Sequence, residues 1–354
     1  MKITKSIISS SLILGSFLLN LNLYAGNEDR IGSAGASEIL VNPWARSSAF
    51  GSAGVASTEG IEAQFSNIAG LAFVDKTQIK FNYTNWLGSA GISLNSAGIA
   101  QRVGAQTVIG VSFQAFGYGA IDITTVDLPE GGIGQFTPRK NIINVGVAHT
   151  FSNSIYAGLN MKIVTENIAN LRTSGVAFDA GVRYITGKEE QVKFGITLRN
   201  VGTPMTYKGD GLSKEIMYQS TSGVATMVQR SASFEMPSSL ALGFAYDFNF
   251  NENNKLTLGL AFVANSFTND QLNVGLDYGL SFGKAALNIR AGYVGEKTIF
   301  SKDKRSTSLT GFTAGVSVDA LLGEKKMPLG FEYAMRLSNP FGVIHSFGVS
   351  FSLK

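Results

Sequence analysis

Few residues in this chain are suited to catalysis or to metal binding. The 354 residues include two histidines and no cysteine. His149 and His345 fall in separate predicted strands, and two imidazoles alone are too few for a usual metal site. No Gly-x-Ser-x-Gly sequence marks a nucleophilic serine, and the glycine-rich stretches at 117–119 and 131–134 lack the strand-to-helix context of a phosphate-binding loop. The sequence therefore predicts a protein that is not an enzyme and that uses no cofactor or metal.

The residues that stand out are charges set in a segment of small residues. In "NPWARSSAFGSAGVASTEGIEAQFSNIAGLAF" (residues 42–73), Arg46, Glu59 and Glu62 lie among Ala, Gly and Ser. This segment is too polar to lie in lipid and too rich in Ala and Gly to form a core of its own. Because charges buried in a protein are normally paired, the function of these residues depends on what surrounds the segment.

The chain begins with a leader. Residues 1–25 contain lysines near the start, then an apolar run over 7–21, and are typical of a secretory signal peptide cleaved after Ala25. A retained membrane anchor is the less favoured alternative, since Asn20 and Asn22 interrupt the run before it reaches the roughly 20 residues of a spanning helix. The formal net charge of +4, without a basic stripe, argues against a nucleic-acid partner.

After residue 76, bulky apolar residues alternate with small or polar residues at a period of two. In "VIHSFGVSFSLK" (343–354), Phe347, Val349 and Phe351 share one face, and serines and a glycine share the other. The segments fit the roughly 9–11 residues that a tilted strand needs to cross a bilayer, whereas strands of soluble sandwiches are usually about five or six residues long. The pattern predicts an all-β fold, a transmembrane outer-membrane β-barrel of about 14 antiparallel strands.

The connections between these strands alternate between short and long. If both termini lie in the periplasm, the long connections at 120–140, 201–236 and 295–307 are all external loops of a barrel formed by residues 77–354. A barrel of this width has a lumen that its own side chains do not fill. Residues 26–76 are therefore predicted to form an N-terminal periplasmic or lumenal plug segment.

Inside the lumen, the charges of the plug segment are expected to find partners on the barrel wall. The inward-facing candidates for Arg46, Glu59 and Glu62 are Asp247, Asp277, Asp319 and Arg290. The alternative is that Arg46 and Glu62 lie at the periplasmic mouth, where water solvates them.

The segment 42–73 resembles the N-terminal signature of the PorV/PorQ family of type IX secretion outer-membrane proteins, which share a FadL-like barrel. The matching residues are Ala45, Arg46, Gly51, Gly54, Val55 and Ala56, followed by Asn67, Ala69, Gly70, Leu71 and Ala72, with Ile68 where the family commonly has Pro. Residues 134–164 are similar to a second family stretch. Asn67 joins Arg46, Glu59 and Glu62 as a candidate plug residue.

The resemblance implies a non-enzymatic component of the type IX protein secretion machinery in the bacterial outer membrane. Its implied partners are a translocon barrel and the C-terminal domains of secreted cargo proteins, in contact with outer-membrane lipid and lipopolysaccharide. The external loop 201–236 is the place to expect such a partner, because it is long and carries apolar residues that water does not stabilise. The candidate partner-binding residues are Tyr207, Leu212, Ile216, Met217, Tyr218 and Met227. Alternatively, the loop folds back over the mouth of its own barrel.

A second class of function is a FadL-like transporter that carries hydrophobic small molecules across the outer membrane through a lumenal pocket and a lateral opening in the wall, with the plug as a gate. That route requires an apolar inward groove. The inward face is interpreted here as Gly, Ser, Ala, Asn and Asp, which disfavours a hydrophobic ligand. A passive structural or adhesive porin is a third reading.

Overall fold

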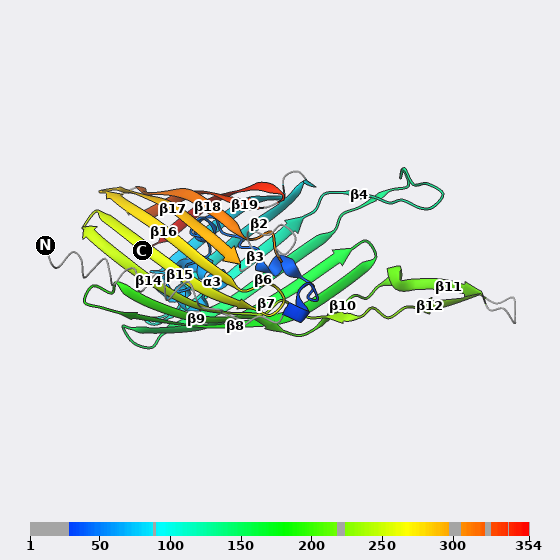
Figure 1. Ribbon diagram of the computed structural model, residues 1–354, viewed down its shortest axis with the longest axis horizontal. Helices are drawn as coiled ribbons and strands as arrows, with labels where there is room; N and C mark the ends of the chain where they lie inside the picture. Colours follow the sequence, from blue (N-terminus) through cyan, green and yellow to red (C-terminus); the bar gives the residue numbers. More distant parts are fainter. Residues whose placement is uncertain are drawn as a thin grey trace.

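The computed structural model describes residues 28–87, 90–217, 224–296, 306–322, 327–338 and 340–353. Within these residues, fourteen strands form one closed antiparallel barrel, as the sequence predicts (Figure 1). The strands are β1 (Thr77–Leu87), β2 (Ile92–Arg102), β3 (Thr107–Gly117), β6 (Arg139–Thr150), β7 (Ile155–Ile168), β8 (Leu171–Thr186), β9 (Val192–Gly202), β14 (Ser239–Asn251), β15 (Asn254–Asn265), β16 (Gln271–Phe282), β17 (Ala285–Glu296), β18 (Gly311–Leu322), β19 (Met327–Ser338) and β20 (Gly342–Leu353). The predicted signal peptide lies outside the described residues.

The barrel wall follows from the alternation in the sequence. On β8, Phe178 and Val182 face outward and are 56% and 47% exposed. Asp179 and Arg183, which directly follow them in the sequence, face the lumen and are buried. The first and last strands close the barrel, with Thr77 paired to Leu353. Closure leaves no unpaired strand edge, which is the condition for a sheet that crosses a bilayer. The described helices include none that is both long and apolar enough to span a membrane.

The two ends of the barrel differ. Short turns join the strands at one end, and two long extensions project from the other (Figure 1). The predicted external loop 120–140 carries the small hairpin β4 (Ile121–Asp122) and β5 (Gln135–Phe136). The predicted loop 201–236 forms an arm, here residues 203–236, which contains β10 (Met205–Thr206), η6 (Asp210–Leu212), β11 (Ser213–Met217), β12 (Val224–Val228) and β13 (Ser233–Phe234). Of the third predicted loop, 295–307, residues 297–305 lie outside the described part of the chain.

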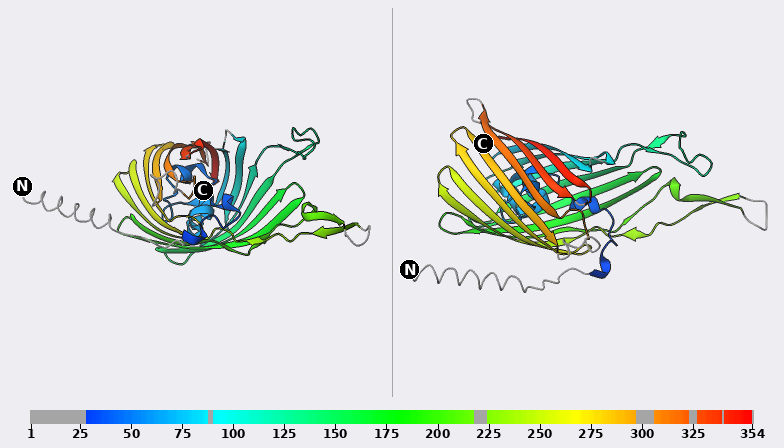
Figure 2. Two further views of the ribbon diagram at one scale, coloured as in Figure 1. Left: turned by 45° about the vertical axis from the view of Figure 1, so that its right-hand side comes forward. Right: turned by 45° about the horizontal axis from the view of Figure 1, so that its top comes forward.

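The segment before β1 begins outside the barrel at its long-loop end, and its part from α2 to η4 (residues 45–73) lies inside the lumen (Figure 2). It is built from short helices: η1 (Glu28–Arg30), η2 (Ser37–Leu40), α2 (Ala45–Ala49), η3 (Gly60–Glu62), α3 (Ala63–Ser66) and η4 (Ile68–Phe73). Its start differs from the expected periplasmic position. Arg30 forms an ion pair with Glu235 of the arm, so the described chain begins at the long-loop end and passes along the lumen toward the start of β1.

A belt of inward-facing glycines lets the plug approach the wall closely. The glycine belt consists of Gly98, Gly110, Gly146, Gly158, Gly181, Gly195, Gly243, Gly259, Gly275, Gly292 and Gly315. Gly275 and Gly292 are cross-strand neighbours, and both face Phe50 and Gly51 of the plug. A Cβ atom at Gly292 would lie 2.4 Å from the backbone nitrogen of Gly51. Because that contact is with backbone, no side-chain rotation relieves it.

We expect Gly292→Ala to destabilise the folded protein by about 1–3 kcal/mol, the usual cost of overpacking, because the plug must shift away from β17. The matched control is Gly295→Ala on the same strand, where the nearest atom to an added Cβ is 3.4 Å away. Denaturant unfolding in detergent, followed by β-sheet circular dichroism, measures both. Equal stability of the two variants would contradict close packing between plug and wall at Gly292.

Candidate functional site: the plugged lumen

A layer of buried charges joins the plug to the wall near the middle of the lumen. The Lys80 ammonium on β1 lies between the carboxylates of Glu62 on the plug and Glu332 on β19, and all three side chains are at most 6% exposed. Lys80 Nζ is 2.5 Å from Glu332 Oε2. Arg46 Nη2 lies 3.0 Å from both Glu332 and Asp319. The layer alternates cations and carboxylates, so each charge has an opposite charge beside it.

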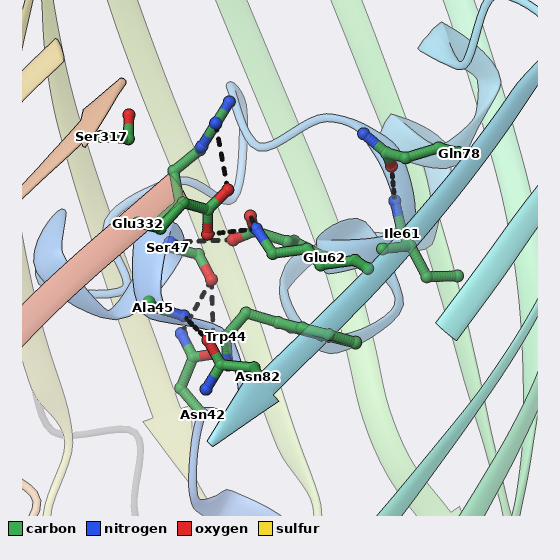
Figure 3. Close-up of polar contacts among 12 residues, drawn as sticks. Asn42, Trp44, Ala45, Ser47, Ile61, Glu62, Gln78, Asn82, Ser317 and Glu332 are labelled. Carbon is green, nitrogen blue, oxygen red and sulfur yellow. Dashed lines mark hydrogen bonds and ion pairs between the residues drawn. The ribbon is translucent and has the colours of Figure 1, made fainter. Parts of the chain in front are cut away.

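Side chains of the wall and of the plug itself accept hydrogen bonds from the start of the plug helix α2. The backbone N–H of Ala45 donates to Asn82 on β1, and that of Ser47 donates to Glu62 (Figure 3). These N–H groups belong to the first turn of α2, where a helix has no internal acceptors. The Asn67 side-chain amide donates to the carbonyls of Val55 and Val182, which links the plug to β8. The plug therefore depends on the barrel for its hydrogen bonds as well as for its charges.

One of the predicted ion pairs between plug and wall forms, and the other predicted pairs do not. Arg46 pairs with Asp319, as predicted. Glu59 instead pairs with Arg183, and Glu62 pairs with Lys80. The other two predicted wall acids pair with wall residues: Asp277 with Arg290, its direct cross-strand neighbour, and Asp247 with Lys193. Lys80, Arg183 and Glu332 were missed, although each falls at an inward position of the two-residue period.

The end of the lumen nearest the long loops is apolar, which corrects the sequence interpretation of a small and polar inward face. Bulky residues at the strand ends point inward there and pack on the plug and on the base of the arm. The cluster contains Ala36, Ile39, Val41, Trp86, Leu94, Phe116, Ile142, Val164, Ala177, Met205, Met236 and Ile344. The alternation assigned bulky residues to the lipid face and overlooked this inward set.

A cavity of about 300 Å³, here called the outer chamber, opens in this apolar layer. Leu40, Val41, Trp86, Phe267 and Leu309 contribute its apolar lining. Two further cavities, of about 520 and 290 Å³, lie among charged residues toward the short-turn end, and Arg46 lines both. Hydrophobic surface thus lines the long-loop end of the lumen, and polar surface lines the short-turn end.

A polar cluster at the rim holds the start of the plug against the wall and the arm. Lys140 lies 2.5 Å from Glu38 and 2.7 Å from Glu166, Tyr118 donates to Glu38, and Tyr207 donates to Glu166. Burial alone would raise the pKa of the Glu38 carboxyl, but the charge and hydrogen bond of Lys140 hold it below its usual value. Burial and the hydrogen bond to Glu166 raise the pKa of Tyr207. Tyr207 is therefore a contact between the arm and its own barrel.

The remaining candidate partner-binding residues lie farther along the arm. Leu212 is partly buried, whereas Ile216 and Met227 are exposed on the β11–β12 hairpin. Tyr218 lies outside the described residues, as does the side chain of Met217. The two histidines stay apart, with His149 beside Thr107 and His345 beside Tyr333. Among the described residues, no group of three or more possible ligands is placed to hold a metal ion.

Several solved structures share this architecture. They include the CymD monoaromatic hydrocarbon channel (TM-score 0.55, 11% identity, 89% of this chain and 98% of that chain). The Ralstonia pickettii toluene transporter TbuX has a TM-score of 0.54 and 13% identity over 89% of this chain and 98% of that chain. A Pseudomonas aeruginosa FadL homologue has a TM-score of 0.51 and 12% identity over 88% and 96%. At these identities the likeness shows the fold alone, a FadL-like outer-membrane barrel. No protein family and no curated protein sequence matches the chain.

We expect Lys80→Met to destabilise the protein by about 3–5 kcal/mol, because it leaves the buried Glu62 and Glu332 carboxylates without their shared cation. The control is Lys255→Met, since Lys255 is 53% exposed and its partner Asp247 keeps a closer contact to Lys193. That exposed pair is worth at most about 1 kcal/mol. Denaturant titration of both variants in the same detergent tests the difference. A small loss at Lys80, comparable to that at Lys255, would show that this layer does not anchor the plug.

Proposed function

We propose that this barrel carries small hydrophobic molecules across the outer membrane, binding them first in the outer chamber. The observation that carries the proposal is the apolar cavity of about 300 Å³ at the long-loop end, lined by Trp86, Phe267 and Leu309. Concave, mostly apolar cavities of this size are where proteins bind small ligands. Proteins of the same fold include ones named as a monoaromatic hydrocarbon channel and a toluene transporter, which supports the same substrate class here.

The plug divides this route into a capture step and a passage step. The outer chamber is lined on one side by Leu40 and Val41 of the plug, so a bound molecule contacts the plug directly. Below it, Arg46, Glu62 and Lys80 close the lumen with charges that a hydrophobic molecule cannot replace. Passage along the whole lumen therefore requires the plug to move relative to β1 and β19. The proposed role of the charged layer is to keep the barrel closed to water between these movements.

Toluene should bind the outer chamber saturably and change the emission of Trp86. The chain has two tryptophans, and Trp44 is buried in the plug at 1% exposure. A Trp44→Phe variant therefore reports on Trp86 alone, and a Trp86→Phe variant reports on Trp44 as the control. Fluorescence titration of both variants in nanodiscs, with empty nanodiscs subtracted, provides the measurement. A response that is absent, or equal in the two variants, would remove the support for transport through this chamber.

A second candidate function is the docking of a protein partner, in line with the resemblance to type IX secretion proteins. The observation that favours it is the arm, which projects beyond the barrel (Figure 1). On its β11–β12 hairpin, Ile216, Val224, Met227 and Val228 are between 42% and 67% exposed. Exposed apolar side chains clustered on one hairpin are typical of an interaction site. The partners to expect are a translocon barrel and the C-terminal domains of secreted cargo.

The double substitution Ile216→Asp with Met227→Asp should abolish recovery of such a partner without unfolding the barrel, because the hairpin lies outside it. The matched control is Val126→Asp, which places a charge at a 99% exposed valine on the other external loop. Affinity purification from native cells in mild detergent, followed by mass spectrometry, identifies what remains bound. Partner recovery that survives the double substitution would exclude the hairpin as its docking site.

A further inference from the structure

Three basic side chains form a row on the outer face of the barrel at its long-loop end. Arg139 on β6 is the cross-strand neighbour of Asn167 on β7, and Asn167 is in turn the neighbour of Arg172 on β8. Beyond β8, Arg172 and Lys208 of the arm exchange two backbone hydrogen bonds of 2.9 Å. Residues directly opposite each other in antiparallel strands point to the same face of the sheet, and all four are exposed. Arg139, Arg172 and Lys208, here called the basic row, therefore lie on one outward-facing line.

The pairing of the strands also fixes the level of the basic row relative to the lipid-facing surface. Along β6, β7 and β8, the next outward level toward the short-turn end is polar, and the two levels after it are apolar. The polar level holds Asn141, Thr165 and Ser174, and the apolar levels hold Ile143, Ile163 and Val176, then Val145, Met161 and Phe178. Outer-membrane barrels carry an apolar band around their outer face that matches the hydrocarbon of the membrane. The basic row therefore stands just beyond this band, at the level of lipid head groups.

The described residues supply no counter-charge to the basic row. No carboxylate among them lies within ion-pair distance of its three side chains, whereas Lys162, on the inward face of β7, pairs with Asp179. Like charges directly opposite each other in a sheet repel, and Arg172 and Lys208 are such a pair. The described barrel strands place no other arginine or lysine on the outer face at the long-loop end. One sector of the rim thus concentrates positive charge that a bound anion would stabilise.

We propose that the basic row binds the phosphate groups of lipid A, the membrane anchor of lipopolysaccharide. Outer-membrane barrels carry their longer loops on the external side, so the row faces the outer leaflet, where lipopolysaccharide lies. Basic clusters beside a membrane-spanning surface bind anionic head groups, and the planar guanidinium matches phosphate oxygens. Arg139 and Arg172 are two strands apart, roughly 10 Å, so they span a large phosphorylated head group. Its acyl chains would lie on the apolar levels of β6, β7 and β8. This inference goes beyond the proposed function, because it concerns the outer face and not the lumen.

The test measures lipid binding to the purified barrel in a nonionic detergent by native mass spectrometry. The probes are diphosphoryl lipid A, the same lipid after removal of its phosphates, and phosphatidylglycerol. We expect diphosphoryl lipid A to bind more tightly than the other two. The double substitution Arg139→Gln with Arg172→Gln should weaken its binding about twentyfold, which is roughly fivefold for each charge removed. The matched control, Lys188→Gln with Lys284→Gln, removes two exposed charges at the short-turn end and should leave the affinity unchanged.

Each outcome bears on a different part of the inference. Equal binding of phosphatidylglycerol and diphosphoryl lipid A would overturn the assignment to lipid A, and equal losses in the two double variants would overturn the assignment to the basic row. Higher salt should weaken binding to the unsubstituted barrel more than to the arginine variant, because salt screens exposed charges. Arg172→Lys, which keeps the charge, should retain part of the affinity. Toluene binding in the outer chamber should be the same in every variant, so a failure here is separate from a failure of the proposed function.

Discussion

A closed barrel of fourteen strands encloses more space than its own side chains fill, and the rest of this structure depends on that constraint. The plug fills the space with backbone and small side chains. It lies closest to the wall where the wall has glycine, as at Gly275 and Gly292 opposite Phe50 and Gly51. The small inward residues of the wall and the small residues of the plug allow the two to pack closely. The packing of each therefore depends on the other.

Charges make the packing between plug and wall specific. An apolar plug could shift along or around the lumen at little cost, whereas Lys80 between Glu62 and Glu332 permits one arrangement. Buried ion pairs add little net stability compared with apolar packing, but breaking them is costly. The layer therefore fixes the position of the plug relative to the wall. Moving the plug past this layer requires several charges to separate together.

The polarity of the lumen changes along its length. The outer chamber lies in the apolar layer at the long-loop end, and the cavities toward the short-turn end are lined by Arg46, Lys193 and other charged residues. A molecule that entered the lumen from the long-loop end would thus meet hydrophobic surface before charged surface. The arm begins at Met205, which is itself part of the apolar layer, so a partner that moves the arm would act on the same chamber. The two proposed functions are physically connected at this point.

The sequence alone determined the barrel, its strand number and the side of the long loops, because alternation and loop length are local properties. It also identified Arg46, Glu59, Glu62 and Asn67 as lumenal candidates. It did not determine their partners: Arg46 and Asp319 lie 273 residues apart, and their meeting depends on the register and tilt of every strand between them. The apolar outer chamber was missed for a related reason. A period of two separates the faces of a strand, but only the closed barrel decides at which depth an inward residue such as Trp86 lies and what the plug places opposite it.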